Sequence, residues 1–131
     1  MKKKTKRAKL TKNLDDLCRK VIRLRDNNRC QKCNKFIEGS NSQPNHVVAK
    51  GNGASWRRFD LLNIILMCNH CHIPWWHRSP TESGKWFAKT FPAREEYLEK
   101  YRYGKPAQIS IPEMEKHKLF LEEKLEELGN D

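Results

Sequence analysis

Apolar residues recur every three or four positions in the first part of the chain, which is the spacing of one helical face. Asn13, just before this stripe, is a favourable N-cap residue, and Asp26-Asn27-Asn28 is a typical helix-ending sequence. The pattern predicts a helix from Asn13 to about Arg25, preceded by a basic, disordered segment over residues 1–12. The stripe consists of Leu14, Leu17, Cys18 and Val21.

Two short apolar runs in the middle of the chain predict strands. These are His46-Val47-Val48 and the run from Ile64 to Met67, with the flexible stretch Gly51-Asn52-Gly53 between them. Upstream, Phe36-Ile37 predicts a short strand or turn. Strands and helices in one short chain indicate the α+β class.

Helical signals dominate the last part of the chain. Ser79-Pro80-Thr81-Glu82 resembles a capping box and opens a helix to about Phe91, and residues 93–103 predict the next helix. Ser110-Ile111-Pro112-Glu113 opens a third, acidic helix that runs to Gly129. Its apolar stripe could pack on the rest of the protein or pair with a second copy in a dimer. We therefore divide the chain into a tail (1–12), a central domain (13–104) and a C-terminal helix (105–131).

Four of the five cysteines form two Cys-x-x-Cys pairs. Each pair can chelate a metal from one tight turn, and four thiolates complete the tetrahedral shell of a structural zinc ion. The fifth, Cys18, lies on the predicted apolar face and is interpreted as a small buried hydrophobe. The pairs are Cys30 with Cys33 and Cys68 with Cys71.

The net charge of +11 is unevenly distributed. Residues 1–29 carry +9 and residues 110–131 carry −4, so the basic part precedes the acidic helix. This asymmetry indicates a polyanionic partner such as DNA, although lysines that only maintain solubility would give part of the same pattern. Lys50, Arg57 and Arg58 are the expected phosphate contacts near the central loop. No apolar run is long enough for a membrane span, so we expect no membrane partner and a cytoplasmic protein.

The segment between the two cysteine pairs resembles the HNH, or ββα-metal, endonuclease motif. The likeness rests on Asn45-His46 at a first strand, Asn63 before a second strand and His72 directly after a Cys-x-x-Cys pair, and it extends over residues 30–78. It implies a small ββα-metal core that holds the four-cysteine zinc and is flanked by helices. It also implies a metal-dependent endonuclease that hydrolyses phosphodiester bonds in DNA.

The resemblance assigns a role to each polar residue of this segment. His46 would be the general base that takes a proton from water, and Asn63 would hold the base or its loop through its side-chain amide. His72 would bind a catalytic Mg²⁺ or Mn²⁺ ion, with Asn45 as a neighbouring ligand and His77 as a further candidate. Most of the family has a carboxylate where this chain has Asn45, so we expect weaker metal binding.

A second likeness extends further along the chain. Trp75-Trp76-His77-Arg78-Ser79-Pro80, Trp86-Phe87 and Phe91-Pro92 are similar to segments of phage recombination nucleases of the NinG (Rap) type. This likeness implies action on branched or joint DNA molecules during recombination. The alternative, in which the histidines have no catalytic role, is a catalytically silent zinc-ribbon module that only binds DNA.

Overall fold

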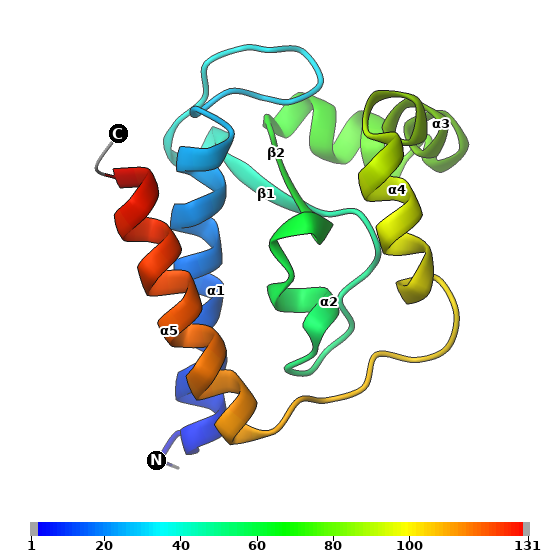
Figure 1. Cartoon of the computed structure of the whole chain (residues 1–131). Helices are drawn as coiled ribbons and strands as arrows, with labels where there is room; N and C mark the ends of the chain where they lie inside the picture. The colour runs from blue at the N-terminus through cyan, green and yellow to red at the C-terminus, as the bar shows by residue number, and fades with distance from the viewer. Residues whose placement is uncertain (1–2, 130–131) are drawn as a thin grey trace.

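The computed structural model describes residues 3–129, which form an α+β structure around a two-stranded antiparallel sheet (Figure 1). Short 3₁₀ turns lie at Gly39–Asn41 (η1), Leu61–Asn63 (η2) and Glu99–Tyr101 (η4). The main elements, in chain order, are α1 (Lys6–Arg25), β1 (Gln43–His46), α2 (Trp56–Phe59), β2 (Ile64–Met67), the π-helix η3 (Cys71–His77), α3 (Pro80–Thr90), α4 (Pro92–Leu98) and α5 (Ile111–Gly129).

Helix α1 begins seven residues earlier than predicted, so the expectation of disorder through Lys12 is wrong for the described residues. Thr5 is the N-cap, and its hydroxyl accepts a hydrogen bond from the Ala8 amide at 3.0 Å. Leu10 extends the apolar stripe by one turn and is buried. Met1 and Lys2 lie outside the described residues.

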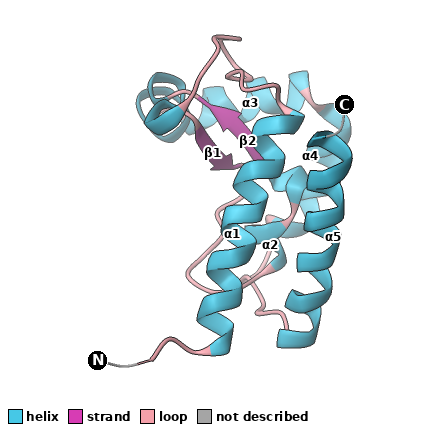
Figure 2. Cartoon of the chain, turned by 90° about the vertical axis from the view of Figure 1, so that its left-hand side faces the viewer, coloured by secondary structure: helices cyan, strands magenta, loops and turns pink. Residues whose placement is uncertain are grey.

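Helix α5 packs along α1, and the two helices run in the same direction side by side (Figures 1 and 2). The predicted start of this helix holds a capping box: the side chains of Ser110 and Glu113 each accept a hydrogen bond from the other residue's amide, at 3.2 and 3.1 Å. Met114 and Leu121 are fully buried in the core that α1 also lines. Of the two alternatives for this helix, packing on its own chain is therefore the one observed.

The two strands of the sheet pair with each other in antiparallel orientation. His46 pairs with Ile64 and Gln43 with Met67, so β1 lies at Gln43–His46 instead of the predicted residues 46–48. The strand ends there because the backbone amide and carbonyl of Val48 both hydrogen-bond the Asn63 side chain instead of a partner strand. The second strand, Ile64–Met67, lies where it was predicted.

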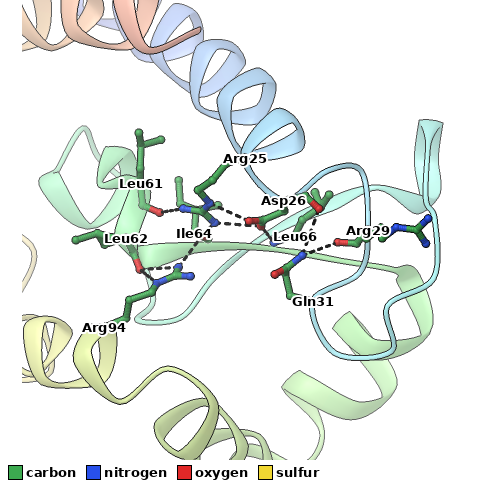
Figure 3. A network of polar contacts seen from close by, with 9 residues as sticks. All are labelled: Arg25, Asp26, Arg29, Gln31, Leu61, Leu62, Ile64, Leu66 and Arg94. Atoms are coloured by element: carbon green, nitrogen blue, oxygen red, sulfur yellow. Dashed lines mark hydrogen bonds and ion pairs between the residues drawn. The ribbon is translucent and has the colours of Figure 1, made fainter. Parts of the chain in front are cut away.

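Side chains cover the free edge of β2, as Figure 3 shows. Arg25 donates to the carbonyls of Leu61 and Ile64, both at 2.6 Å, and is held by the buried carboxylate of Asp26. Asp26 accepts from the Leu66 amide at 3.0 Å, and Arg94 donates to the Leu62 and Ile64 carbonyls. These bonds satisfy an edge that would otherwise offer unpaired backbone groups to another chain. They also fix β2, whose C-terminal end leads directly into the second cysteine pair.

The tryptophans pack against helices and not on an open surface. Trp76 meets Trp86 and Phe87 edge-on, at ring-centroid distances of 6.4 and 6.2 Å, and Phe87 is fully buried. This cluster joins η3 to α3. Ser79 makes no capping bond at the start of α3, so the predicted capping box does not form there. Within the described residues, no helix combines the length and apolar character of a membrane span.

Candidate metal centre and histidine groove

The four paired cysteines converge on one point. Their Sγ atoms all lie within 4.8 Å of one another, and those of Cys33 and Cys68 are 3.9 Å apart. Sulfur ligands about 2.3 Å from a tetrahedral zinc ion are separated by about 3.8 Å, so the cluster fits such an ion. The sequence prediction of four metal-binding cysteines is consistent with this geometry.

Each cysteine pair lies in a turn that directs both thiols inward. In the first, the Asn34 amide bonds the Cys30 carbonyl at 2.8 Å, and Asn34 takes the left-handed conformation, φ 64°, that asparagine tolerates better than most residues. In the second, the Cys71 amide lies 3.4 Å from the Cys68 Sγ. The first turn follows α1 and the second follows β2, so a bound metal would join two segments far apart in the sequence.

The local environment separates the pKa values of the thiols. Burial raises the pKa of Cys30, but nearby backbone groups of Cys33, Cys68 and Lys32 outweigh it and lower the pKa to about 7. Burial and the neighbouring thiols of Cys68 and Cys30 raise the pKa of Cys71. A cluster of this kind resists full ionisation by itself, whereas a divalent cation favours the thiolate form of every ligand.

A groove of about 420 Å³ lies beside the sheet. Its lining includes Asn45 and His46 from β1, Lys50 from the following loop, and His72 and His77 from η3. The structure thus brings together the predicted base and all three predicted ligands of the catalytic metal. A smaller hollow continues past His46 toward Asp15 and Arg19 on α1.

His46 is held by the loop that follows it. Its Nε2 lies 2.9 Å from the Arg58 carbonyl, which can only accept, so Nε2 carries the proton and Nδ1 keeps a free lone pair. Burial lowers the pKa of His46 below its usual value, and the positive charge of Lys50 adds to this effect. The ring is therefore neutral and able to accept a proton at neutral pH.

Asn63 is fully buried and fastens this loop. Its Oδ1 accepts from the Val48 amide at 2.8 Å, and its Nδ2 donates to the carbonyls of Val48 and Arg57 at 2.9 and 2.7 Å. The next carbonyl after Arg57 is the one that orients His46. Asn63 therefore holds the loop that follows His46, and its role beside a catalytic base stays a prediction.

His72 and His77 face each other although they are five residues apart. Their Nε2 atoms are 3.0 Å apart, and the His72 Nδ1 lies 3.0 Å from the Oε1 of Gln43. A π-helix stacks residues about five apart, and Pro74, which cannot donate a backbone bond, interrupts the regular helix in this segment. Two ligands at right angles, about 2.1 Å from one ion, would also be about 3.0 Å apart.

Asn45 lies on the same side of β1 as Gln43 and is nearly completely buried. Its Nδ2 faces the Met67 sulfur at 3.6 Å, and its Oδ1 is buried. This oxygen has no hydrogen-bond partner in the part of the chain that the structure describes. A buried amide oxygen without a partner, on a residue that lines the same groove as His72 and His77, makes Asn45 a candidate for a third metal ligand.

Of the three residues predicted to contact DNA, two are bonded to other segments of the chain and one lines the groove. Arg58 forms a bidentate ion pair with Asp15, at 2.9 and 2.6 Å, and Arg57 donates to the carbonyls of Tyr103 and Gly104 at 3.3 and 3.0 Å. Both guanidinium groups thus tie the loop to other segments. Lys50 lines the groove, and its ammonium group has no partner among the described residues.

Cys18 and His117 both contact the Phe59 carbonyl. Cys18 is buried with its Sγ 3.6 Å from the Phe59 carbonyl, and burial raises its pKa to about 12, as expected of an inert core thiol. His117 belongs to the acidic C-terminal helix, where the sequence predicts an ordinary surface residue, but it is half-buried: its Nε2 lies 2.9 Å from the same carbonyl, and its ring meets Trp56 edge-on. The sequence interpretation omitted Gln43, which the alternation of strand side chains places on the Asn45 face.

Comparison of the chain with family models, with curated proteins and with solved structures finds no significant match. The functional assignment therefore rests on the geometry of the two sites described above.

Proposed function

We propose that the protein is a metal-dependent DNA endonuclease whose general base is His46. The observation that supports this most strongly is the shared groove, which is lined both by a neutral, oriented imidazole and by a pair of imidazole nitrogens 3.0 Å apart. The order β1, loop, β2 and η3 supports the resemblance to the ββα-metal motif. A zinc-binding module that only recognises DNA would not require this arrangement.

The residues divide the chemistry between them. His46 Nδ1 accepts the proton of the attacking water, and the Arg58 carbonyl keeps the ring in the tautomer that allows this. His72, His77 and the Asn45 oxygen are the residues that would hold a divalent cation. When bound, such a cation neutralises the charge that builds on the phosphate and the leaving oxygen. Because this set has two imidazoles and no carboxylate, we expect it to favour Mn²⁺ over Mg²⁺.

Charge near the groove supports a nucleic-acid substrate. Lys50 lines the groove, and Arg19 lines the adjoining hollow. Arg19 and Lys12 share the carboxylate of Asp16, and the exposed Lys9 and Lys20 add further positive charge on α1. A phosphate backbone along this side would bring a scissile bond between His46 and the imidazole pair.

The decisive experiment is cleavage of plasmid and branched DNA by zinc-loaded protein with Mn²⁺, Mg²⁺ or EDTA. We expect cleavage with the divalent ions and none with EDTA. His46→Ala should lower the rate at saturating substrate at least about 100-fold while DNA binding and zinc content stay unchanged. His70→Ala is a matched control, because His70 is exposed and lines no part of the groove. A folded His46→Ala protein that cuts at the wild-type rate would leave the silent zinc-ribbon DNA-binding module as the better assignment.

A further inference from the structure

Gln43 determines which nitrogen of His72 carries the proton. Its Nε2 donates to the Ser40 carbonyl at 2.9 Å, and this bond fixes the orientation of the amide. Its Oε1 must then face the His72 Nδ1, 3.0 Å away. A carbonyl oxygen only accepts, so His72 is protonated at Nδ1 and its Nε2 keeps a free lone pair.

The contact with His72 determines which nitrogen of His77 carries the proton. Its Nε2 lies 3.0 Å from the His72 Nε2, which has no proton to donate. In the metal-free protein, His77 must therefore donate from Nε2. Among the described residues its imidazole has no other hydrogen bond, and it is exposed, whereas His72 is held from both sides.

We propose that Gln43 is a positioning residue that presets His72 as the primary metal ligand, while His77 changes tautomer when the metal binds. The His77 proton leaves Nε2 for solvent, and Nδ1 takes one up, so the ring stays neutral and no net proton is released. Both Nε2 lone pairs would then be free to hold a divalent cation. This inference rests on the metal site of the proposed function but concerns a residue outside the ligand set.

Metal affinity and histidine tautomers test this role without measuring cleavage. In zinc-loaded, ¹⁵N-histidine-labelled protein, NMR should show His72 protonated at Nδ1 and His77 at Nε2. A second equivalent of Zn²⁺, as a diamagnetic probe, should move the His77 proton to Nδ1 and leave His72 as it is. Gln43→Leu should leave His72 without a fixed tautomer and weaken Mn²⁺ binding about 10- to 100-fold. Gln43→Glu loses the donation to the exposed Ser40 carbonyl but keeps an acceptor for the His72 Nδ1 proton, so it should bind Mn²⁺ at least as tightly as the wild type.

The outcomes separate this proposal from the proposed function. Unchanged Mn²⁺ affinity and an unchanged His72 tautomer in Gln43→Leu would overturn the role of Gln43, even if His72→Ala abolished Mn²⁺ binding. Unchanged Mn²⁺ affinity in His72→Ala would instead overturn the metal site itself, and the proposal with it. If Gln43→Leu failed to fold, Gln43→Glu would decide, because markedly weaker Mn²⁺ binding by that folded variant would contradict the role.

Discussion

Replacing Asn63 by alanine should cost the fold about 3 to 5 kcal/mol. The change removes three hydrogen bonds between the Asn63 side chain and the backbone, two to Val48 and one to Arg57, all of 2.9 Å or less. A buried polar group left without a partner costs about 1–3 kcal/mol. The two Val48 groups are buried and should contribute most of the loss, whereas water can reach the Arg57 carbonyl at the edge of the loop.

Asn63→Asp tests the direction of these bonds. One carboxylate oxygen can still accept from the Val48 amide, but the other would face the carbonyls of Val48 and Arg57. The new carboxyl fits only when protonated, so its folded-state pKa should lie above its unfolded value of about 3.9. A raised folded pKa gives stability that is present at low pH and is lost as pH rises through that pKa. This variant should therefore be closer to wild type at pH 5 than at pH 7.

Urea unfolding at a fixed free-zinc concentration measures both effects, since metal binding contributes to the apparent stability. Asn13→Ala is the matched control: Asn13 is exposed on α1 and should change the free energy of unfolding by less than about 0.5 kcal/mol. Asn63→Ala should also slow cleavage at urea concentrations well below its unfolding midpoint, where the variant is still folded. The reason is that the loop carries the carbonyl that orients His46. A loss of stability under about 1 kcal/mol would refute the interpretation of Asn63 as the residue that fastens this loop.

Three further predictions concern other parts of the chain. Elemental analysis should find one zinc per chain. Cys68→Ser should lose zinc and most of the folded structure, because metal binding and folding are coupled. A wild-type protein that is folded without zinc would contradict this prediction. Deleting residues 1–12 should destabilise the protein because it removes buried Leu10, whereas replacing Lys9 and Lys12 by glutamine should only weaken DNA binding and flatten its salt dependence. Burial lowers the pKa of His117, so the stability that the neutral ring contributes is present above its unfolded pKa of about 6.5 and is lost as pH falls through the folded pKa. A His117→Gln variant that lost as much stability on acidification as the wild type would count against this assignment.

The parts of the structure that the sequence predicted well depend on neighbouring residues. The two cysteine pairs lie in local turns, and the start of the last helix at Ser110–Glu113 depends on residues within a single helical turn, so spacing alone indicates both. The strand at Ile64–Met67 was also found, because four consecutive apolar residues fit a strand buried on both faces.

The parts that the sequence did not predict depend on distant partners. Residues 6–12 have little apolar periodicity of their own, and their helix is stabilised by α5, which begins about a hundred residues later. Val47 and Val48 have high strand propensity, but the Asn63 side chain binds the Val48 backbone and ends the strand. The ion pair between Arg58 and Asp15 joins residues far apart in the chain, and nothing in the local sequence indicates it.

The cysteine cluster and the histidine groove are parts of one structural unit. Cys68 follows β2 directly, its carbonyl accepts the His72 amide at 2.9 Å, and Cys71 precedes His72 in the chain. A metal held by Cys68 and Cys71 therefore fixes the backbone from which His72 reaches Gln43 on β1. The first cysteine pair links this same point to the end of α1, through the turn that follows Asp26. Zinc at the cysteines would thus act on cleavage without touching the substrate, because it keeps the imidazole pair at the distance that a second, catalytic cation requires.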